Sequence, residues 1–509
     1  MKDIIYQTLP RLWGAKGNQS GKFSAYDDLT LDYLSGLGVT HVWYTGVIRH
    51  ATTYSCPGCP ASGSSIVKGK AGSPYSIVDY YDVNPFLADN PRGRMEEFET
   101  LVERTHAHGL KVIMDFIPNH VSRDYGKVGL VNEDVRAFGA DDDPSAHWKP
   151  ENDFYYYPGE ALRLPVNEPY EEFPAKASGN VFSPAPGIND WYETVKLNYC
   201  DFHTGTWDKA LDIVRYWCAK GVDGFRCDMV ELVPWQFMKW LIENVKKEYP
   251  KVIFIAEVYV KERYSLYVKE VGFDYLYDKS GLYDCLYAIV QGHGSARGIT
   301  YNWQSLGDLR PHTLNFLENH DEPRFASDFF GRDADRSYAP LAASLYSGTS
   351  PFMLYFGEEL GERGMDSEGF SSVNGRTTIF DWWTVGSLDR LYDCVHGKGS
   401  LREKEERTLR NYREALRFAS EPAISEGKDY DLCYCNLDSP GFDPDRHFAF
   451  LRSDGEATWL FVCDFADTDA RISLRVPREA YEYLEVKNPN PVSEIEVSVK
   501  ANDFTKIKL

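Results

Sequence analysis

The chain has 509 residues, which is long for one hydrophobic core, so its length predicts two or three domains. Its composition, 43% hydrophobic and 26% charged, is that of a globular protein, and its net charge of −22 argues against nucleic acid or an anionic membrane as a partner. No run approaches the ~20 apolar residues of a membrane span. The first residues show no secretory signal, and the ten cysteines have no repeated spacing, so we expect a cytoplasmic protein.

Short apolar runs alternate with amphipathic stretches over most of the chain, which is typical of βαβ units and a parallel sheet. The eight strands that we predict are Ile4–Leu9, Thr40–Tyr44, Lys111–Phe116, Val222–Cys227, Val252–Ala256, Phe273–Tyr277, Thr313–Leu317 and Phe352–Phe356. Between them, apolar residues at three- and four-residue spacing predict helices, as in Arg94–His108 and Pro234–Lys247. Eight parallel strands favour a closed (β/α)8 barrel of the TIM type, formed by residues 1–120 and 206–424.

Two segments interrupt this alternation. Residues 121–205 are rich in Pro, Asn, Asp, Tyr and Gly and have no clear period, and a structureless loop of that length is uncommon. We therefore expect a small irregular domain inserted after the third strand. Residues 425–509 predict a C-terminal antiparallel β-sandwich domain, with strands at His447–Leu451, Thr458–Cys463, Ala470–Val476 and Glu494–Val499.

Charged and imidazole side chains follow four of the predicted strands, at the end of the barrel where such enzymes build their active sites. The third strand ends in Asp115-Phe-Ile-Pro-Asn119-His120, the fourth in Gly224-Phe-Arg226-Cys-Asp228, the fifth in Phe254-Ile-Ala-Glu257 and the seventh in Phe316-Leu-Glu-Asn-His320-Asp321. A single acid after a strand is more often a helix N-cap or a solvated loop residue. Repetition at four strands instead predicts three carboxylates, Asp228, Glu257 and Asp321, around one mouth.

Cleavage of a glycosidic bond is a reaction that requires carboxylates in such an arrangement. Retaining enzymes use one carboxylate as the nucleophile and a carboxylic acid about 5–5.5 Å away as the proton donor. Arg226 faces the same side of its strand as Asp228, so we expect this cation to keep Asp228 ionised. Glu257 must begin the reaction protonated, which partial burial and neighbouring acids favour.

The four strand-end segments resemble the four signature regions of the α-amylase family of retaining glycoside hydrolases and transglycosylases. The resemblance covers nearly the whole chain. It implies that Asp228 is the nucleophile, Glu257 the general acid/base and Asp321 the stabiliser of the transition state. The residues to which it assigns substrate binding are Tyr75, His120, Arg226, His320 and Asn198.

The resemblance also bears on cofactors and partners. Asn119 matches a family position that often binds a structural calcium ion, so Ca²⁺ is the cofactor to consider, and no organic cofactor is expected. The implied partner is an α-glucan or malto-oligosaccharide substrate.

One stretch departs from the family pattern. Many α-amylases place a Lys-His pair after the nucleophile, whereas this chain reads Asp228-Met-Val-Glu231-Leu. The site beyond the scissile bond must therefore be built differently, which leaves the substrate open. We predict hydrolysis of α-1,4-glucosidic bonds in malto-oligosaccharides or starch-type glucans, with glycosyl transfer to a sugar as the alternative. A remote alternative is a catalytically inactive binding homologue, against which the presence of all three carboxylates argues.

Overall fold

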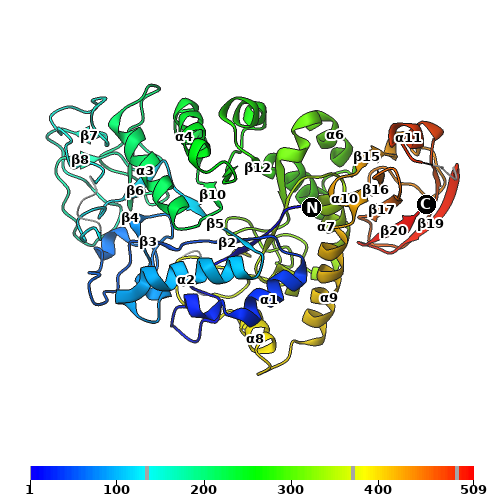
Figure 1. The fold of residues 1–509 in the computed structure, drawn as a ribbon, viewed down its shortest axis with the longest axis horizontal. Helices are drawn as coiled ribbons and strands as arrows, with labels where there is room; N and C mark the ends of the chain where they lie inside the picture. The colour runs from blue at the N-terminus through cyan, green and yellow to red at the C-terminus, as the bar shows by residue number, and fades with distance from the viewer. Residues whose placement is uncertain (1, 132–136, 368–372, 488–491) are drawn as a thin grey trace.

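Eight parallel strands form a closed barrel at the centre of the molecule. The computed structural model describes residues 2–131, 137–367, 373–487 and 492–509 (Figure 1). The strand order around the barrel is β1-β14-β13-β12-β11-β10-β5-β2. The bounds are β1 Ile4–Thr8, β2 His41–Tyr44, β5 Lys111–Phe116, β10 Gly224–Cys227, β11 Ile253–Ala256, β12 Tyr275–Tyr277, β13 Thr313–Phe316 and β14 Phe352–Tyr355. Each lies within a predicted strand, so the predicted (β/α)8 barrel is confirmed.

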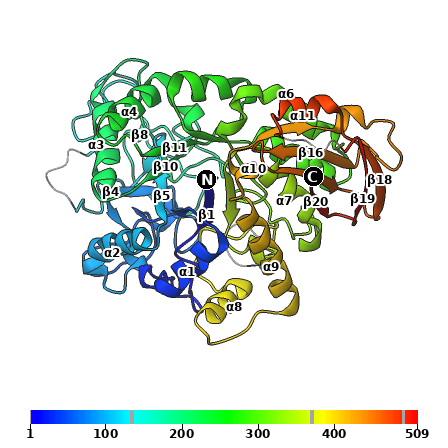
Figure 2. The same ribbon diagram turned by 45° about the vertical axis from the view of Figure 1, so that its right-hand side comes forward.

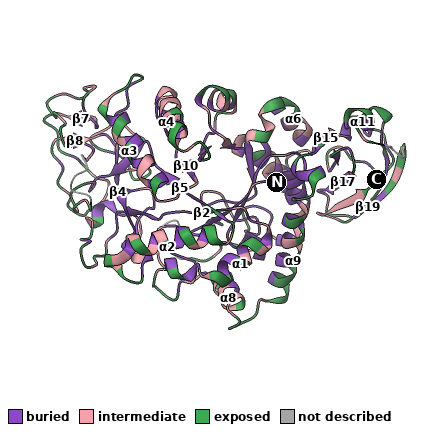
Figure 3. Ribbon diagram, in the orientation of Figure 1, coloured by how far each residue is buried: buried purple, intermediate pink, exposed green. Residues whose placement is uncertain are grey.

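The helices around the barrel are amphipathic, and their apolar faces pack on the strands. In α4, Trp235–Glu248, the buried residues Phe237, Met238, Leu241, Ile242 and Val245 recur at three- and four-residue spacing. Other helices are α1 Asp28–Leu37, α2 Arg94–Ala107, α3 Gly205–Ala219, α5 Asp284–Val290, α6 Arg297–Leu306, α7 Tyr338–Tyr346, α8 Gly386–Val395 and α9 Glu403–Phe418. Figure 3 shows buried strands inside and exposed surface on the outer side of α1, α2 and α8. Among the described helices, none is long and apolar enough to cross a membrane.

The chain leaves the barrel after β5 and returns to it at α3. The described part of residues 121–205 consists mostly of turns, with the short strands β6 His120–Ser122, β7 Tyr156–Tyr157, β8 Ala175–Lys176 and β9 Thr194–Lys196. β6 and β9 pair antiparallel, which places Lys196 opposite His120. The inserted segment is therefore fastened to the barrel where it leaves β5. A second excursion, after β2, contains the antiparallel pair β3 Ile48–His50 and β4 Ile77–Val83.

Two antiparallel sheets form the C-terminal region, which lies beyond α7 and α9 in Figure 2. One contains β15 Lys428–Asp431, β16 His447–Ser453, β17 Thr458–Asp464 and β20 Phe504–Lys508, and the other contains β18 Ala470–Arg475 and β19 Glu494–Val499. The sequence prediction missed β15, an edge strand that reads Lys-Asp-Tyr-Asp, and β20. The short helices α10 Pro422–Ser425 and α11 Arg478–Tyr483 flank these sheets.

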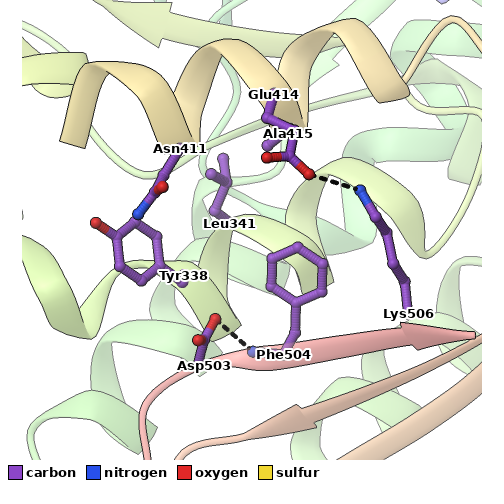
Figure 4. Close-up of a pocket in the computed structure, with 8 residues that line it drawn as sticks. All are labelled: Tyr338, Leu341, Asn411, Glu414, Ala415, Asp503, Phe504 and Lys506. Carbon is purple, nitrogen blue, oxygen red and sulfur yellow. Dashed lines mark hydrogen bonds and ion pairs between the residues drawn. The ribbon is translucent and has the colours of Figure 1, made fainter. Parts of the chain in front are cut away.

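Aromatic contacts join this region to the barrel. The ring of Tyr346, at the end of α7, lies 5.0 Å from the ring of Phe461 and 5.7 Å from that of Phe504. A pocket of about 270 Å³ remains between α7, α9 and β20, where Lys506 Nζ lies 3.4 Å from Glu414 Oε1 (Figure 4). The hydrophobic core continues from the barrel into the C-terminal sheets. The C-terminal region thus packs against the barrel through α7 and α9, and none of its described residues lines the pocket at the carboxyl ends of the barrel strands.

Candidate active site

The carboxylates predicted from the strand ends meet in one pocket of about 390 Å³. Asp228 follows β10, Glu257 follows β11 and Asp321 follows β13, so the pocket lies at the carboxyl ends of the barrel strands. The residues that line it are Lys68, Ser73, Tyr75, His120, Trp191, Glu193, Thr194, Asp228, Met229, Glu257, Tyr259, His320, Asp321, Arg376, Ile379 and Phe380. Six of the nine predicted site residues are among them.

Arg226, in β10, is buried next to this pocket and holds its acids together. Its Nη1 lies 2.7 Å from Asp228 Oδ1 and 3.5 Å from Asp115 Oδ1, and its Nη2 lies 2.8 Å from Glu257 Oε2. The planar guanidinium contacts several carboxylates from one fixed position, which a lysine cannot do. Because the side chain is 0% exposed and does not line the pocket, Arg226 positions the acids and does not face the substrate.

The charge of Asp228 depends on more than this arginine. Burial raises the pKa of Asp228 well above its ordinary value, the Arg226 cation lowers it, and the charges of Glu257 and Asp115 raise it again. The sequence prediction treated Arg226 as the partner of Asp228 alone. Because three carboxylates share this guanidinium, Arg226 lowers the pKa of Asp228 against the larger effect of burial and against the charges of the two neighbouring acids.

Neighbouring donors hold Glu257 at both carboxyl oxygens. Oε2 accepts the backbone N–H of Met229 at 2.8 Å, and Oε1 accepts the hydroxyl of Tyr259 at 2.7 Å. Met229 has a left-handed backbone with φ of 44°, a conformation that costs a residue other than glycine about 1–3 kcal/mol. This turn directs the Met229 amide at Glu257, so the stretch after Asp228 orients the second carboxylate.

Asp321 forms an ion pair with His320. Nε2 of His320 lies 3.0 Å from Asp321 Oδ2 and 2.6 Å from the Tyr75 hydroxyl, and its Nδ1 lies 2.7 Å from the Gln7 amide. Burial raises the pKa of Asp321, but the charges of His320 and Arg226 lower it more, to about 2, so Asp321 is ionised at neutral pH. Its side chain is 42% exposed, which leaves it within reach of a ligand in the pocket.

Aromatic rings supply the other walls of the pocket. Tyr75 stacks on His320 with ring centroids 5.4 Å apart, and Trp191 lies 5.2 Å from the ring of His120. Burial, followed by repulsion from Lys196, lowers the pKa of His120 to about 3, so this imidazole is neutral. Aromatic faces with polar edges are suited to a ring-shaped ligand that has both apolar faces and hydroxyl groups.

Asn198 does not line the pocket. Its Nδ2 donates to the carbonyl oxygens of Lys149 and Asn152, each at 2.8 Å, and its Oδ1 accepts the indole N–H of Trp148 at 3.1 Å. The side chain is fully buried. The structure therefore gives Asn198 a role inside the inserted segment, where it joins loops, and does not bring it to the predicted substrate-binding residues.

The side chain of Asn119 is engaged by neighbouring residues and not arranged for calcium. Its Oδ1 accepts a hydrogen bond from the Lys196 ammonium at 2.5 Å, and its Nδ2 donates to the Gly179 carbonyl at 2.8 Å. Calcium takes six to eight oxygen ligands, usually with several carboxylates. Within the described ranges, no group of three or more His, Cys, Asp or Glu residues is placed to hold a metal ion. The residues around Asn119 therefore do not fit this ion.

Sequence reasoning missed several residues that line the pocket. Tyr259 follows Glu257 by two residues and extends the same strand end, a spacing that could have identified it. Lys68 pairs with Glu193 at 2.9 Å across the wall formed by the excursion after β2 and the inserted segment. Arg376 is exposed and lowers the pKa of Asp321 from a loop after β14. No periodicity marks these loop residues, so the sequence gives no signal for them.

Comparison with known proteins identifies a matching family model and similar proteins. A family model described as the α-amylase catalytic domain matches residues 27–484. The chain is 24% identical over 373 residues to α-amylase 3 of Dictyoglomus thermophilum, covering 71% of this chain and 64% of that protein. It is 26% identical over 360 residues to a cyclomaltodextrin glucanotransferase of Geobacillus stearothermophilus, covering 66% and 44%. The chain thus spans 64% and 44% of the lengths of these curated relatives.

Solved structures share the fold over the whole chain. An α-amylase from Lactobacillus plantarum has a TM-score of 0.66 at 18% identity, and covers 100% of this chain and 98% of its own. The cyclic α-maltosyl-(1→6)-maltose hydrolase of Arthrobacter globiformis, in complex with that cyclic sugar, has a TM-score of 0.66 at 16% identity, with the same coverage. At these identities the likeness establishes the arrangement of barrel and C-terminal sheets, while the chemistry has to be argued from the pocket.

Proposed function

This chain belongs to the α-amylase family, and we propose that it hydrolyses α-1,4-glucosidic bonds in malto-oligosaccharides or starch-type glucans with retention of configuration. The reaction is a double displacement. The Asp228 carboxylate attacks C1 of the glucose unit while Glu257 gives its proton to the departing glycosidic oxygen. A water molecule then gives a proton to Glu257 and attacks C1, which releases Asp228 and restores the original configuration.

The observation that carries this proposal is the shared contact of Asp228 and Glu257 with one guanidinium. Arg226 lies 2.7 Å from Asp228 and 2.8 Å from Glu257, through different nitrogens of the same fork. Two acids gathered on one guanidinium suit the separation of about 5–5.5 Å in retaining enzymes better than the about 6.5–9.5 Å of inverting enzymes. At the shorter separation a carboxylate attacks C1 directly, without an intervening water molecule.

Asp321 supports the same chemistry from a third strand end, that of β13. Its pKa of about 2 keeps a negative charge beside the sugar as the oxocarbenium-like transition state develops. His320 pairs with Asp321, and the Tyr75 hydroxyl in turn contacts His320, so the charge does not have to reorganise during the reaction. We assign to Tyr75 and His120 the contacts with the glucose ring.

The stereochemical outcome tests the proposal. Proton NMR of maltoheptaose digestion should show the α-anomer of the new reducing end before mutarotation mixes the two forms. If the β-anomer appears first, the double displacement is wrong, and Asp228 is not the nucleophile. The rate of spontaneous mutarotation is measured with the free sugar in the absence of enzyme, and the first spectra must be recorded before mutarotation has mixed the anomers.

Glycosyl transfer is the second candidate, because the stretch after the nucleophile, Met229–Leu232, lacks the Lys-His pair that is common in the family, and its Met229 lines the pocket. A sugar hydroxyl would replace water in the second step. Chromatography of early maltoheptaose products separates the two functions: oligomers longer than seven units indicate transfer, whereas shorter products alone indicate hydrolysis. A starch, pullulan and trehalose panel would then define the preferred substrate.

A further inference from the structure

The junction between the inserted segment and the barrel contains a lysine at a position where a metal ion was expected. We propose that the ammonium group of Lys196 replaces a structural calcium ion there, so that the folded chain does not depend on bound calcium. This inference concerns how the junction is held together, and it stands whether or not the proposed substrate is correct.

Lys196 joins three parts of the chain through one cation. Its Nζ donates to Asn119 Oδ1 at 2.5 Å, just past β5, and to the Leu232 carbonyl at 3.3 Å, after β10. Its backbone belongs to β9, where it pairs with His120. A bound metal ion would join the same parts of the chain, because it would coordinate oxygen atoms from the inserted segment and from two neighbouring strand ends.

The acceptors around Lys196 are neutral oxygens. In the described part of the chain, Lys196 forms no ion pair, whereas the neighbouring Lys176 lies 3.8 Å from Glu172, and Lys209 pairs with Asp153. Amide and carbonyl oxygens are also ligands of calcium. An ammonium already bound to them repels a second cation, because no carboxylate of the described residues pairs with Lys196 to offset two positive groups.

The junction is coupled to the pocket through neighbouring residues. Asn119 Nδ2 lies 3.2 Å from Nδ1 of His120, which lines the pocket. Leu232 ends the short turn that starts after Met229, whose amide holds Glu257. Lys196 is therefore a positioning residue: it does not line the pocket itself, and it holds two segments whose residues His120 and Met229 do.

The native chain provides the first test. The protein is treated with EGTA, exchanged into buffer with or without millimolar CaCl₂, and melted by differential scanning calorimetry, while the bound metal is measured by atomic emission. We expect the same melting temperature in both buffers and no stoichiometric calcium. A melting temperature that rises by several degrees with calcium overturns the proposal, because a ligand that binds only the folded state stabilises it by mass action.

Variants of Lys196 provide the second test. Lys196→Met should lower the melting temperature by several degrees with or without calcium, whereas Lys127→Met should not, since Lys127 lies on the surface of the same segment with 46% of its side chain exposed. Equal melting temperatures for the two variants overturn the proposal. If Lys196→Met does not fold, the comparison of the native chain with and without calcium decides.

Replacing Lys196 by an acidic residue should make the stability of the folded chain depend on calcium. Lys196→Asp puts a carboxylate beside the oxygens of Asn119 and Leu232, so calcium should raise the melting temperature of this variant and leave that of the native chain unchanged. A rise of the same size in the native chain contradicts the proposal. The readout is stability, so it does not require the enzyme to be active.

Discussion

Arg226 and Lys196 are two buried or partly buried cations near the same pocket, and their surroundings are opposite. Arg226 contacts three carboxylates, those of Asp115, Asp228 and Glu257. Lys196 contacts an amide oxygen and a backbone carbonyl oxygen. The first cluster has more negative than positive charge, and the second has a positive charge without a negative partner.

This difference in surroundings indicates a catalytic role for the Arg226 cluster and a structural role for Lys196. Around Arg226, burial and then the charges of the neighbouring acids raise the pKa of Asp228, so this cluster is suited to proton exchange at the cost of folded-state stability. Around Lys196, a cation satisfies backbone and amide oxygens that would otherwise be left without a donor, which stabilises the fold. Substitutions in the first cluster should therefore change turnover, and those in the second should change the melting temperature.

The largest effect is expected for Asp228→Asn. Loss of the nucleophile should lower kcat by about 10⁴-fold or more. The melting temperature should not fall by more than a few degrees, because the substitution removes one of the excess buried acids. Steady-state kinetics on maltoheptaose and thermal melting by circular dichroism measure the two quantities. A variant that keeps a tenth of the native kcat would refute the assignment of Asp228.

A matched pair of conservative exchanges tests the comparison directly. Arg226→Lys keeps the charge but loses the fork, and misplacement of the two catalytic acids should lower kcat by about 10²-fold. Lys196→Arg also keeps the charge, and it should lower the melting temperature while it changes kcat much less. Measuring both quantities for both variants completes the test. The same loss of kcat in the two variants would show that the two cations do not have separate roles.

Removing the Tyr259 hydroxyl should have a smaller effect. Tyr259→Phe deletes one hydrogen bond to Glu257 Oε1, and the value of such a bond predicts a loss of about 2- to 10-fold in kcat/KM. The loss should appear in kcat, because the bond orients the carboxyl group of Glu257. A loss no larger than that of the control variant would mean that Tyr259 does not orient Glu257. Tyr301→Phe, at an exposed tyrosine outside the pocket, is the control.

The sequence predicted the barrel because the barrel strands are buried and rich in apolar residues, a strong local signal, as in Ile253–Ala256. It predicted Asp228, Glu257 and Asp321 because each follows such a run. It did not predict Tyr259 as a partner of Glu257, or Lys196 as a partner of Asn119. These pairs form when the fold brings separate strand ends together, and the local pattern of apolar and polar residues carries no information about which ends meet. The competition of three acids for Arg226 is hidden for the same reason.

The smallest effect is expected for Asp115→Asn. The charge of Asp115 raises the pKa of Asp228, so its removal should lower that pKa. Activity is lost on the acidic side as pH falls through the pKa of the nucleophile, and the acid limb of kcat/KM should therefore move to lower pH, by less than about one unit. The profile of maltoheptaose hydrolysis measures the shift, with the exposed Asp454→Asn as control. A limb that moves to higher pH would mean that Asp115 chiefly holds Arg226 in place, and that the charge of Asp115 does not raise the pKa of Asp228.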